Sequence, residues 1–135
     1  MTKPTVFHSL AFRDADAGIA FLTALGFEER LVVRNETDPG IVEHAQFHWG
    51  GNGAIMFGSA QRADTPGSEW ERRVGVASCY LVVPTDADVD EVYQRAMAAG
   101  ATSLQEPVGQ DYGGRSAGVA DPEGNQWSIG SYPGE

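Results

Sequence analysis

The chain has 135 residues, of which 41% are hydrophobic and 21% charged, a composition typical of one globular domain with its own core. Nine Lys and Arg against 19 Asp and Glu give a net charge of −10, which argues against nucleic acid as a partner, because that binding depends on neutralising phosphates. This charge would favour a cationic ligand, although acidity that only keeps a small protein soluble is the simpler interpretation.

No stretch approaches the roughly 20 apolar residues that a membrane span requires, and the N-terminal residues hold no apolar run of signal-peptide length. We therefore expect a cytoplasmic protein with no membrane partner. The single cysteine, Cys79, cannot form an internal disulfide and stands in the apolar run 76–83. We expect it to be a buried small side chain rather than a catalytic thiol.

The first half of the chain predicts the order strand, helix and three strands. Asp14 and Asp16 can cap the helix, apolar residues follow them at helical spacing, and Gly26 ends it. A glycine-rich hairpin turn is expected at 50–53. The strands are expected at 5–12, 27–34, 41–49 and 54–57.

The second half repeats that order after a polar connection at 59–75. Asp86 or Asp88 can cap its helix, and Gly100 ends it. Residues 121–124, Asp-Pro-Glu-Gly, fit a type I turn whose glycine takes the left-handed position. The strands are expected at 76–83, 102–106, 115–120 and 126–131.

The repeated pattern predicts one α+β domain over residues 1–135, built from two βαβββ modules. The modules are expected to cover residues from about 4 to 58 and from about 76 to 131.

Four stretches of the sequence resemble a known family. They are 14–27 (DADAGIAFLTALGF), 44–47 (HAQF), 54–58 (AIMFG), and a closing hairpin made of 112–115 (YGGR) and 121–128 (DPEGNQWS). Together they resemble the glyoxalase, bleomycin-resistance and extradiol-dioxygenase superfamily, also called the vicinal-oxygen-chelate fold, and the closing hairpin is most similar to the bleomycin-resistance branch. The resemblance implies curved mixed sheets around a shared cavity, with helices on the outer face. It does not imply a reaction, because lyases, isomerases, dioxygenases and binding proteins share this scaffold.

Metal-dependent members of that superfamily carry His or Glu at four cavity-facing strand positions. By resemblance these positions fall on Phe7, Met56, Ser78 and Ser128, none of which is a good ligand for a divalent metal. We therefore expect no metal and no cofactor. His8 follows the first position, so strand alternation puts it on the helix-facing side unless a bulge turns it toward the cavity.

The two other histidines do not replace the missing ligands. His44 and His48 share a strand face with Gln46, but a rise of about 3.3 Å per residue separates them by roughly 13 Å, too far to bind one ion. We expect both to be polar residues of the cavity wall.

Strand alternation predicts which side chains line the cavity, since the opposite faces of the same strands are more apolar and suit a core against the helices. A narrow, watery groove filled by small side chains is the alternative. The predicted cavity-facing residues are Phe7, Ser9, His44, Gln46, His48, Ala54, Met56, Ser78, Tyr80, Gln126 and Ser128.

Two further candidate ligand-binding residues lie outside that set. Trp70, in the connection, can stack over a ligand as a lid or pack locally. Arg115 can anchor an anionic or carbonyl group at the cavity rim or pair with an acidic neighbour.

Two function classes remain. The first is a metal-free binding protein that sequesters an antibiotic or metabolite, with a small aromatic or cationic organic molecule as its ligand. The alternative is an enzyme of the lyase, isomerase or dioxygenase type, using Tyr80, His44 or His48 as acid or base, or a metal site elsewhere. We favour binding. Open sheet edges and helix flanks also predict a homodimer.

Overall fold

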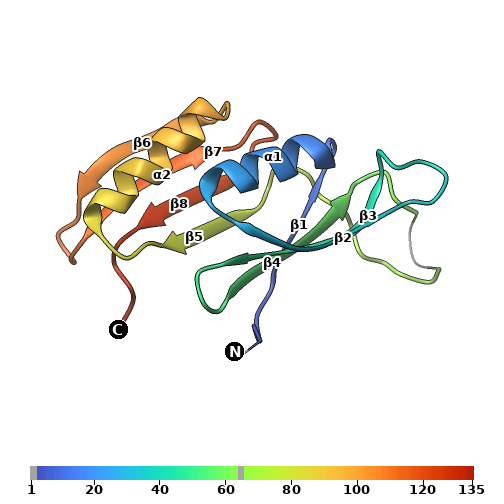
Figure 1. The fold of residues 1–135 in the computed structure, drawn as a ribbon, viewed down its shortest axis with the longest axis horizontal. Helices are drawn as coiled ribbons and strands as arrows, with labels where there is room; N and C mark the ends of the chain where they lie inside the picture. Colours follow the sequence, from blue (N-terminus) through green and yellow to red (C-terminus); the bar gives the residue numbers. More distant parts are fainter. Residues whose placement is uncertain (1–2, 64–65) are drawn as a thin grey trace.

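The computed structural model describes residues 3–63 and 66–135, which form two four-stranded mixed sheets and two helices (Figure 1). The first module contains β1 (His8–Phe12), α1 (Ala15–Leu25), β2 (Glu28–Arg34), β3 (Val42–Trp49) and β4 (Gly53–Ser59). The second contains β5 (Ser78–Val82), α2 (Asp86–Ala98), β6 (Thr102–Gly109), β7 (Arg115–Ala120) and β8 (Gln126–Gly130). The predicted α+β class and the repeated order are confirmed, and the sheets do not close into barrels.

Both sheets have the same topology, with strand orders β1-β4-β3-β2 and β5-β8-β7-β6. In each, the strand before the helix pairs in parallel with the last strand of the module, and the other pairs are antiparallel. An isolated parallel bridge joins Ala11 of β1 to Val74 of the connection between the modules. The connection between modules therefore runs close to β1, although its residues 64–65 lie outside the described residues.

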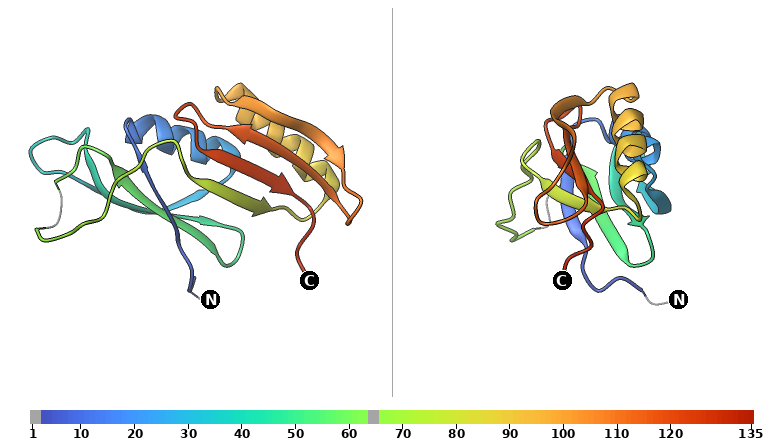
Figure 2. Two further views of the ribbon diagram at one scale, coloured as in Figure 1. Left: turned by 180° about the vertical axis from the view of Figure 1, so that it is seen from behind. Right: turned by 90° about the vertical axis from the view of Figure 1, so that its left-hand side faces the viewer.

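The two helices contact each other and lie on the same side of the two sheets, as the end-on view in Figure 2 shows. One hydrophobic core joins the helices and both sheets. Its helical members are Ala15, Phe21, Leu22 and Leu25 of α1 and Val89, Val92, Tyr93 and Ala96 of α2. Neither helix has the length and apolar character needed to span a membrane.

The predicted helix ends are correct for α1 and partly wrong for α2. Asp14 caps α1 by accepting a hydrogen bond from the backbone N–H of Ala17, and Gly26 ends it with a φ of 122°. The N-cap of α2 is Thr85 rather than either predicted aspartate. The Thr85 hydroxyl accepts from the Asp88 N–H while the Asp88 carboxylate accepts from the Thr85 N–H, so the two residues form a capping box.

Three polar contacts hold the modules together. The Glu123 carboxylate, in the β7–β8 turn, accepts from the backbone N–H groups of Arg13 and Asp14 at 2.6 and 2.8 Å. At the other end of α1, Arg95 of α2 donates to the last carbonyl groups of the helix at 2.8 and 2.9 Å. The indole N–H of Trp49 donates to the carbonyl of Val82 at 2.8 Å. The first helix is thus fixed at both ends by the second module.

Candidate ligand-binding site

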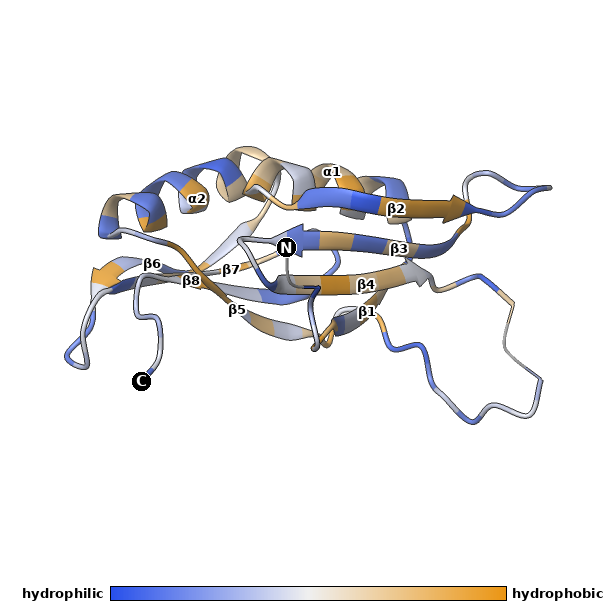
Figure 3. Cartoon of the chain, turned by 60° about the horizontal axis from the view of Figure 1, so that its bottom comes forward, coloured by the Kyte–Doolittle hydropathy of each residue, from blue (hydrophilic) through white to orange (hydrophobic). Residues whose placement is uncertain are grey.

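No helix of the described residues covers the second side of the sheets, and polar side chains gather there. We call this surface the helix-free face. Its residues alternate with buried ones, as β3 shows from His44 to His48. Figure 3 shows hydrophilic and hydrophobic residues interspersed along this strand. The helix-free face comprises Ser9, His44, Gln46, His48, Met56, Ser78, Tyr80, Gln126 and Ser128, all half-buried or exposed.

The strand registers bring these side chains together in rows. In the first sheet Met56 pairs with Ser9 on one side and Gln46 on the other, so the three lie side by side across β1, β4 and β3. Beside this row, a nitrogen of the His44 ring lies 2.9 Å from the side-chain amide nitrogen of Gln46. Phe7 is half-buried just before β1.

The second sheet places Tyr80 opposite Ser128, and Ser78 opposite Gln126. Tyr80 is 42% exposed. A Cβ atom at position 130 would overlap its hydroxyl, so the glycine there gives the tyrosine ring its place over β8. Ring and neutral hydrogen-bonding groups thus share one surface, the combination that organic ligands use.

Two more tyrosines approach Tyr80 from the β6–β7 loop and the C-terminal segment. The Tyr80 hydroxyl donates to the carbonyl of Tyr132 at 3.1 Å, and the rings of Tyr112 and Tyr132 meet edge to face with centroids 5.2 Å apart. Burial, followed by the nearby Tyr112 hydroxyl, raises the pKa of Tyr80. A concavity of about 330 Å³ lies here, lined by Tyr80, Tyr112, Leu104, Gln126 and Ser128 among others.

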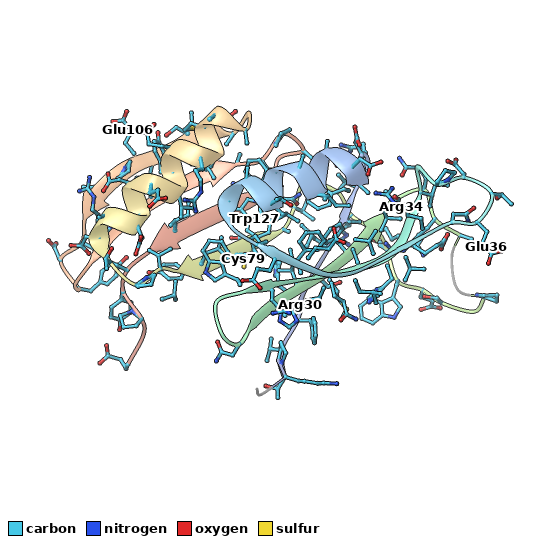
Figure 4. The ribbon with its side chains drawn as sticks, viewed as in Figure 1. Arg30, Arg34, Glu36, Cys79, Glu106 and Trp127 are labelled. Atoms are coloured by element: carbon cyan, nitrogen blue, oxygen red, sulfur yellow. The ribbon has the colours of Figure 1, made fainter. Side chains whose placement is uncertain are left out.

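His8 lies on the other side of β1, as alternation predicted. Its ring meets Trp127 of β8 edge to face, with centroids 6.1 Å apart, so it belongs to the seam between the modules. Trp127 is also the register partner of Cys79, and Figure 4 labels both near this seam. Burial raises the pKa of the Cys79 thiol, so this half-buried cysteine remains protonated and unreactive.

The seam makes stability depend on pH through His8. Its Nε2 atom is buried without a hydrogen-bond partner, and burial lowers its pKa from the ordinary 6.5. The unfolded chain therefore binds more protons than the folded chain just below pH 6.5, and stability is lost as the pH falls through this range. Replacing His8 by Phe keeps a ring against Trp127 and removes the titrating group.

We expect the melting temperature of His8→Phe minus that of the wild type to be larger at about pH 5 than at about pH 7.5. Differential scanning calorimetry at both pH values checks this. The comparison with the wild type cancels the other titrating groups, so an unchanged difference would contradict the role of His8.

The structure separates the alternatives for Trp70 and Arg115. Trp70 is 89% exposed, so it does not pack locally and is available to a ligand. Arg115 donates two hydrogen bonds to Asp90 of α2 at 2.8 and 2.9 Å. These bonds lower the pKa of the Asp90 carboxyl group. Its guanidinium is thus held toward the helix side of the sheet. Arg115 therefore pairs with an acidic neighbour and does not anchor a ligand at the cavity rim.

The family follows from the sequence of nearly the whole chain. Residues 6–129 match the profile of the Glyoxalase/Bleomycin resistance protein/Dioxygenase superfamily. The chain belongs to this superfamily. TioX from Micromonospora sp. ML1 has a similar structure, with a TM-score of 0.70 at 25% identity over 96% of this chain and 98% of that one. The lactoylglutathione lyase of Agrobacterium tumefaciens gives 0.65 at 25% identity over 94% and 93%.

A shorter stretch is similar to a mycobacterial protein. An uncharacterized protein of Mycobacterium bovis is 48% identical over 46 residues, which span 34% of this chain and 30% of that protein. The match therefore covers about a third of each chain. The superfamily neighbours include an enzyme by name, so membership does not by itself decide between binding and catalysis.

The residues that the resemblance assigns to the four superfamily metal positions do not fit a divalent metal. Phe7, Met56, Ser78 and Ser128 offer a phenyl ring, a thioether and two neutral hydroxyls, which supply neither charge nor imidazole. Within 3–63 and 66–135, no group of three or more His, Cys, Asp or Glu side chains could hold a metal ion.

Sequence reasoning missed two features of this surface. Tyr112 and Tyr132 join Tyr80, but neither lies in a strand, so periodicity carried no signal for them. Arg62 lies against Gly58 on the helix-free face. A glycine inside a strand was the available signal there, since it often marks a close approach by another group.

Proposed function

We propose that this superfamily member binds a small planar aromatic molecule on its helix-free face and does so without a metal. The observation that carries this is Tyr80, 42% exposed beside the neutral side chains of Ser128 and Gln126. Aromatic rings stack on such a surface, while neutral amides and hydroxyls orient the ligand by hydrogen bonds.

The three tyrosines and the net charge of −10 also suit a positively charged ring or substituent at this end of the face. A cation over a tyrosine ring is worth about 0.5–2 kcal/mol per contact. Trp70, exposed in the connection, offers a further ring face. A cytoplasmic protein with these properties would sequester an antibiotic or metabolite, as expected for the bleomycin-resistance branch.

We further propose that two copies pair across this face. Large apolar side chains are exposed on the same side of the strands as Tyr80 and Gln46. Val82 lies two residues after Tyr80 and therefore shares its face, and Leu31 is the register partner of Gln46. A second copy would cover them and turn the open face into a cavity. Light scattering at tens of micromolar should give twice the monomer mass, and a monomer mass would count against the pairing. The exposed apolar residues include Leu31, Val33, Tyr80, Val82, Leu104 and Tyr112.

Binding is tested by calorimetry on Tyr80 variants. A thermal-shift screen of aromatic and cationic antibiotics, neutral aromatics and organic acids supplies a ligand. Tyr80→Ala should weaken that ligand by about tenfold or more, which is roughly 1.4 kcal/mol. Tyr80→Phe, the matched control, loses the hydrogen bond to Tyr132 but keeps the ring and should bind nearly as well. Unchanged affinity in Tyr80→Ala would place the ligand elsewhere.

The alternative of an enzyme is favoured by one observation, the similarity to a lactoylglutathione lyase at 25% identity. Two measurements separate the classes. Elemental analysis of protein never exposed to a nickel column should find no stoichiometric Zn, Ni, Fe or Mn. Mass spectrometry after prolonged incubation should recover the bound ligand unchanged. One metal per chain, or a converted ligand, would support the enzyme instead.

A further inference from the structure

The guanidinium of Arg62 occupies a prepared place on the helix-free face. Arg62 follows β4 in the connection, and a Cβ atom at position 58 would overlap its Nη1 atom and lie 2.6 Å from its Cζ. Position 58 lies two residues after Met56 in β4, so a side chain there would point to the same face as Met56. The glycine therefore lets the guanidinium lie directly against the strand, on the surface where a ligand is expected.

This guanidinium is incompletely satisfied. Its Nη1 atom is buried and has no hydrogen-bond partner, which is costly for a charged donor. Burial and the positive charge of Arg72 lower the pKa of Arg62, and the carboxylate of Glu43 only partly opposes this. Nη1 itself faces β4, so an anion in the adjoining cavity would approach the rest of the guanidinium and add counter-charge to that of Glu43.

Basic side chains gather around Arg62 although the protein is strongly acidic. Arg62 lines a cavity of about 540 Å³ together with Arg72 and Arg73, so three of the nine Lys and Arg residues share one cavity. Among the lining residues that the structure describes, Glu71 carries a carboxylate, and it binds Arg73 at 2.8 Å. Arg72 donates to the carbonyls of Arg62 and Ala63 and so holds this part of the connection in place.

The same cavity reaches the rows of polar side chains. Ser9 of β1 and Ser78 of β5 line it, and exposed Trp70 lies at its edge. Two hydroxyl donors, a guanidinium and an indole therefore surround one space. An anionic group with an attached ring fits this set, because a guanidinium binds carboxylates and phosphates through paired hydrogen bonds.

We propose that this cavity is an anion subsite anchored by Arg62, so that the aromatic ligand carries an acidic group at this end of the face, away from the three tyrosines. The inference rests on the proposed function, since it adds an acidic group to the aromatic ligand of the helix-free face. It also means that local charge, rather than the net charge of −10, decides the sign of the group bound at this end.

The test uses four matched probes that share a ring and differ in charge: 2-naphthoate, 2-naphthyl phosphate, 2-naphthylmethanol and 2-naphthylmethylammonium. Isothermal calorimetry on the wild-type protein should show at least one anion binding about tenfold tighter than the neutral alcohol. The preference should shrink as salt is added. The two anions distinguish a carboxylate from a phosphate, and this arm needs no variant.

Arg62→Gln should abolish the preference for the anion and leave the neutral alcohol unaffected. Arg30→Gln is the matched control, because it changes the net charge by the same amount. Arg30 belongs to β2 and pairs with Glu28 at 3.2 Å, and Figure 4 labels it. Circular dichroism and melting temperature confirm that each variant is folded.

The outcomes separate this inference from the proposed function. Naphthyl probes that bind equally well whatever their charge would overturn the subsite and leave aromatic binding standing. An anion whose binding depends on Arg62 but not on Tyr80 would support the subsite and overturn the aromatic proposal. No binding by any probe would overturn both.

Discussion

Replacing Asp121 by Ala is expected to lower the free energy of unfolding by about 3–5 kcal/mol. Asp121 is 4% exposed at the start of the β7–β8 turn, and its carboxylate accepts four hydrogen bonds. Two come from the backbone N–H groups of Glu123 and Asn125, and two from the side chains of Asn125 and Trp127 at 3.0 Å each. Alanine would leave these donors unpaired, most of them buried.

Urea unfolding monitored by tryptophan fluorescence measures this loss. Asp111→Ala removes the same charge from an exposed loop and should stay within about 0.5 kcal/mol of the wild type. If Asp121→Ala lost less than about 1 kcal/mol, the hydrogen bonds of the turn would not be what holds it.

Phe27→Ala should be nearly as destabilising, by about 3–5 kcal/mol, because it opens a void in the seam between the modules. Phe27 is 4% exposed. The centroid of its ring lies 4.9 Å from the ring centroid of Trp49 and 5.8 Å from that of Trp127. Removing it takes one aromatic packing partner from each of these two large side chains. The wet, loosened seam should also weaken the contact between His8 and Trp127.

Phe27→Leu is the matched control, since it keeps most of the volume and should cost no more than about 1.5 kcal/mol. Thermal unfolding followed by far-UV circular dichroism compares both variants with the wild type. Equal losses in the two variants would show that the aromatic ring, and not the filled volume, matters at this position.

Local patterns predicted most of the fold because each element carries its own signal. Asp14 and Gly26 mark the ends of α1, and alternation along β3 separates His44 and Gln46 from the buried residues between them. The cap of α2 was wrong because three neighbouring residues could each accept the first N–H groups. Only the reciprocal geometry of Thr85 and Asp88 decides between them.

The candidate site was predicted only as far as strand faces extend. Tyr80 and Ser78 follow from alternation, whereas the partner of Arg115 comes from α2, 25 residues away. Arg62 and Gly58 meet through the path of the connection after β4, and no sequence period encodes such a meeting. Contacts made by loops depend on the assembled structure, so they could not be read from local sequence.

The hydrogen bonds between the Glu123 carboxylate and the start of α1 affect when the first helix can reach its native position during synthesis. The backbone N–H group of Arg13 leaves the ribosome 110 residues before the carboxylate that binds it. Until then the first helix lacks its anchor at one end, and Arg95, which holds its other end, is also still to come. The first helix of a growing chain therefore lacks both of these anchors until residue 123 has been synthesised, and we expect its final position to be fixed only after the second module is in place.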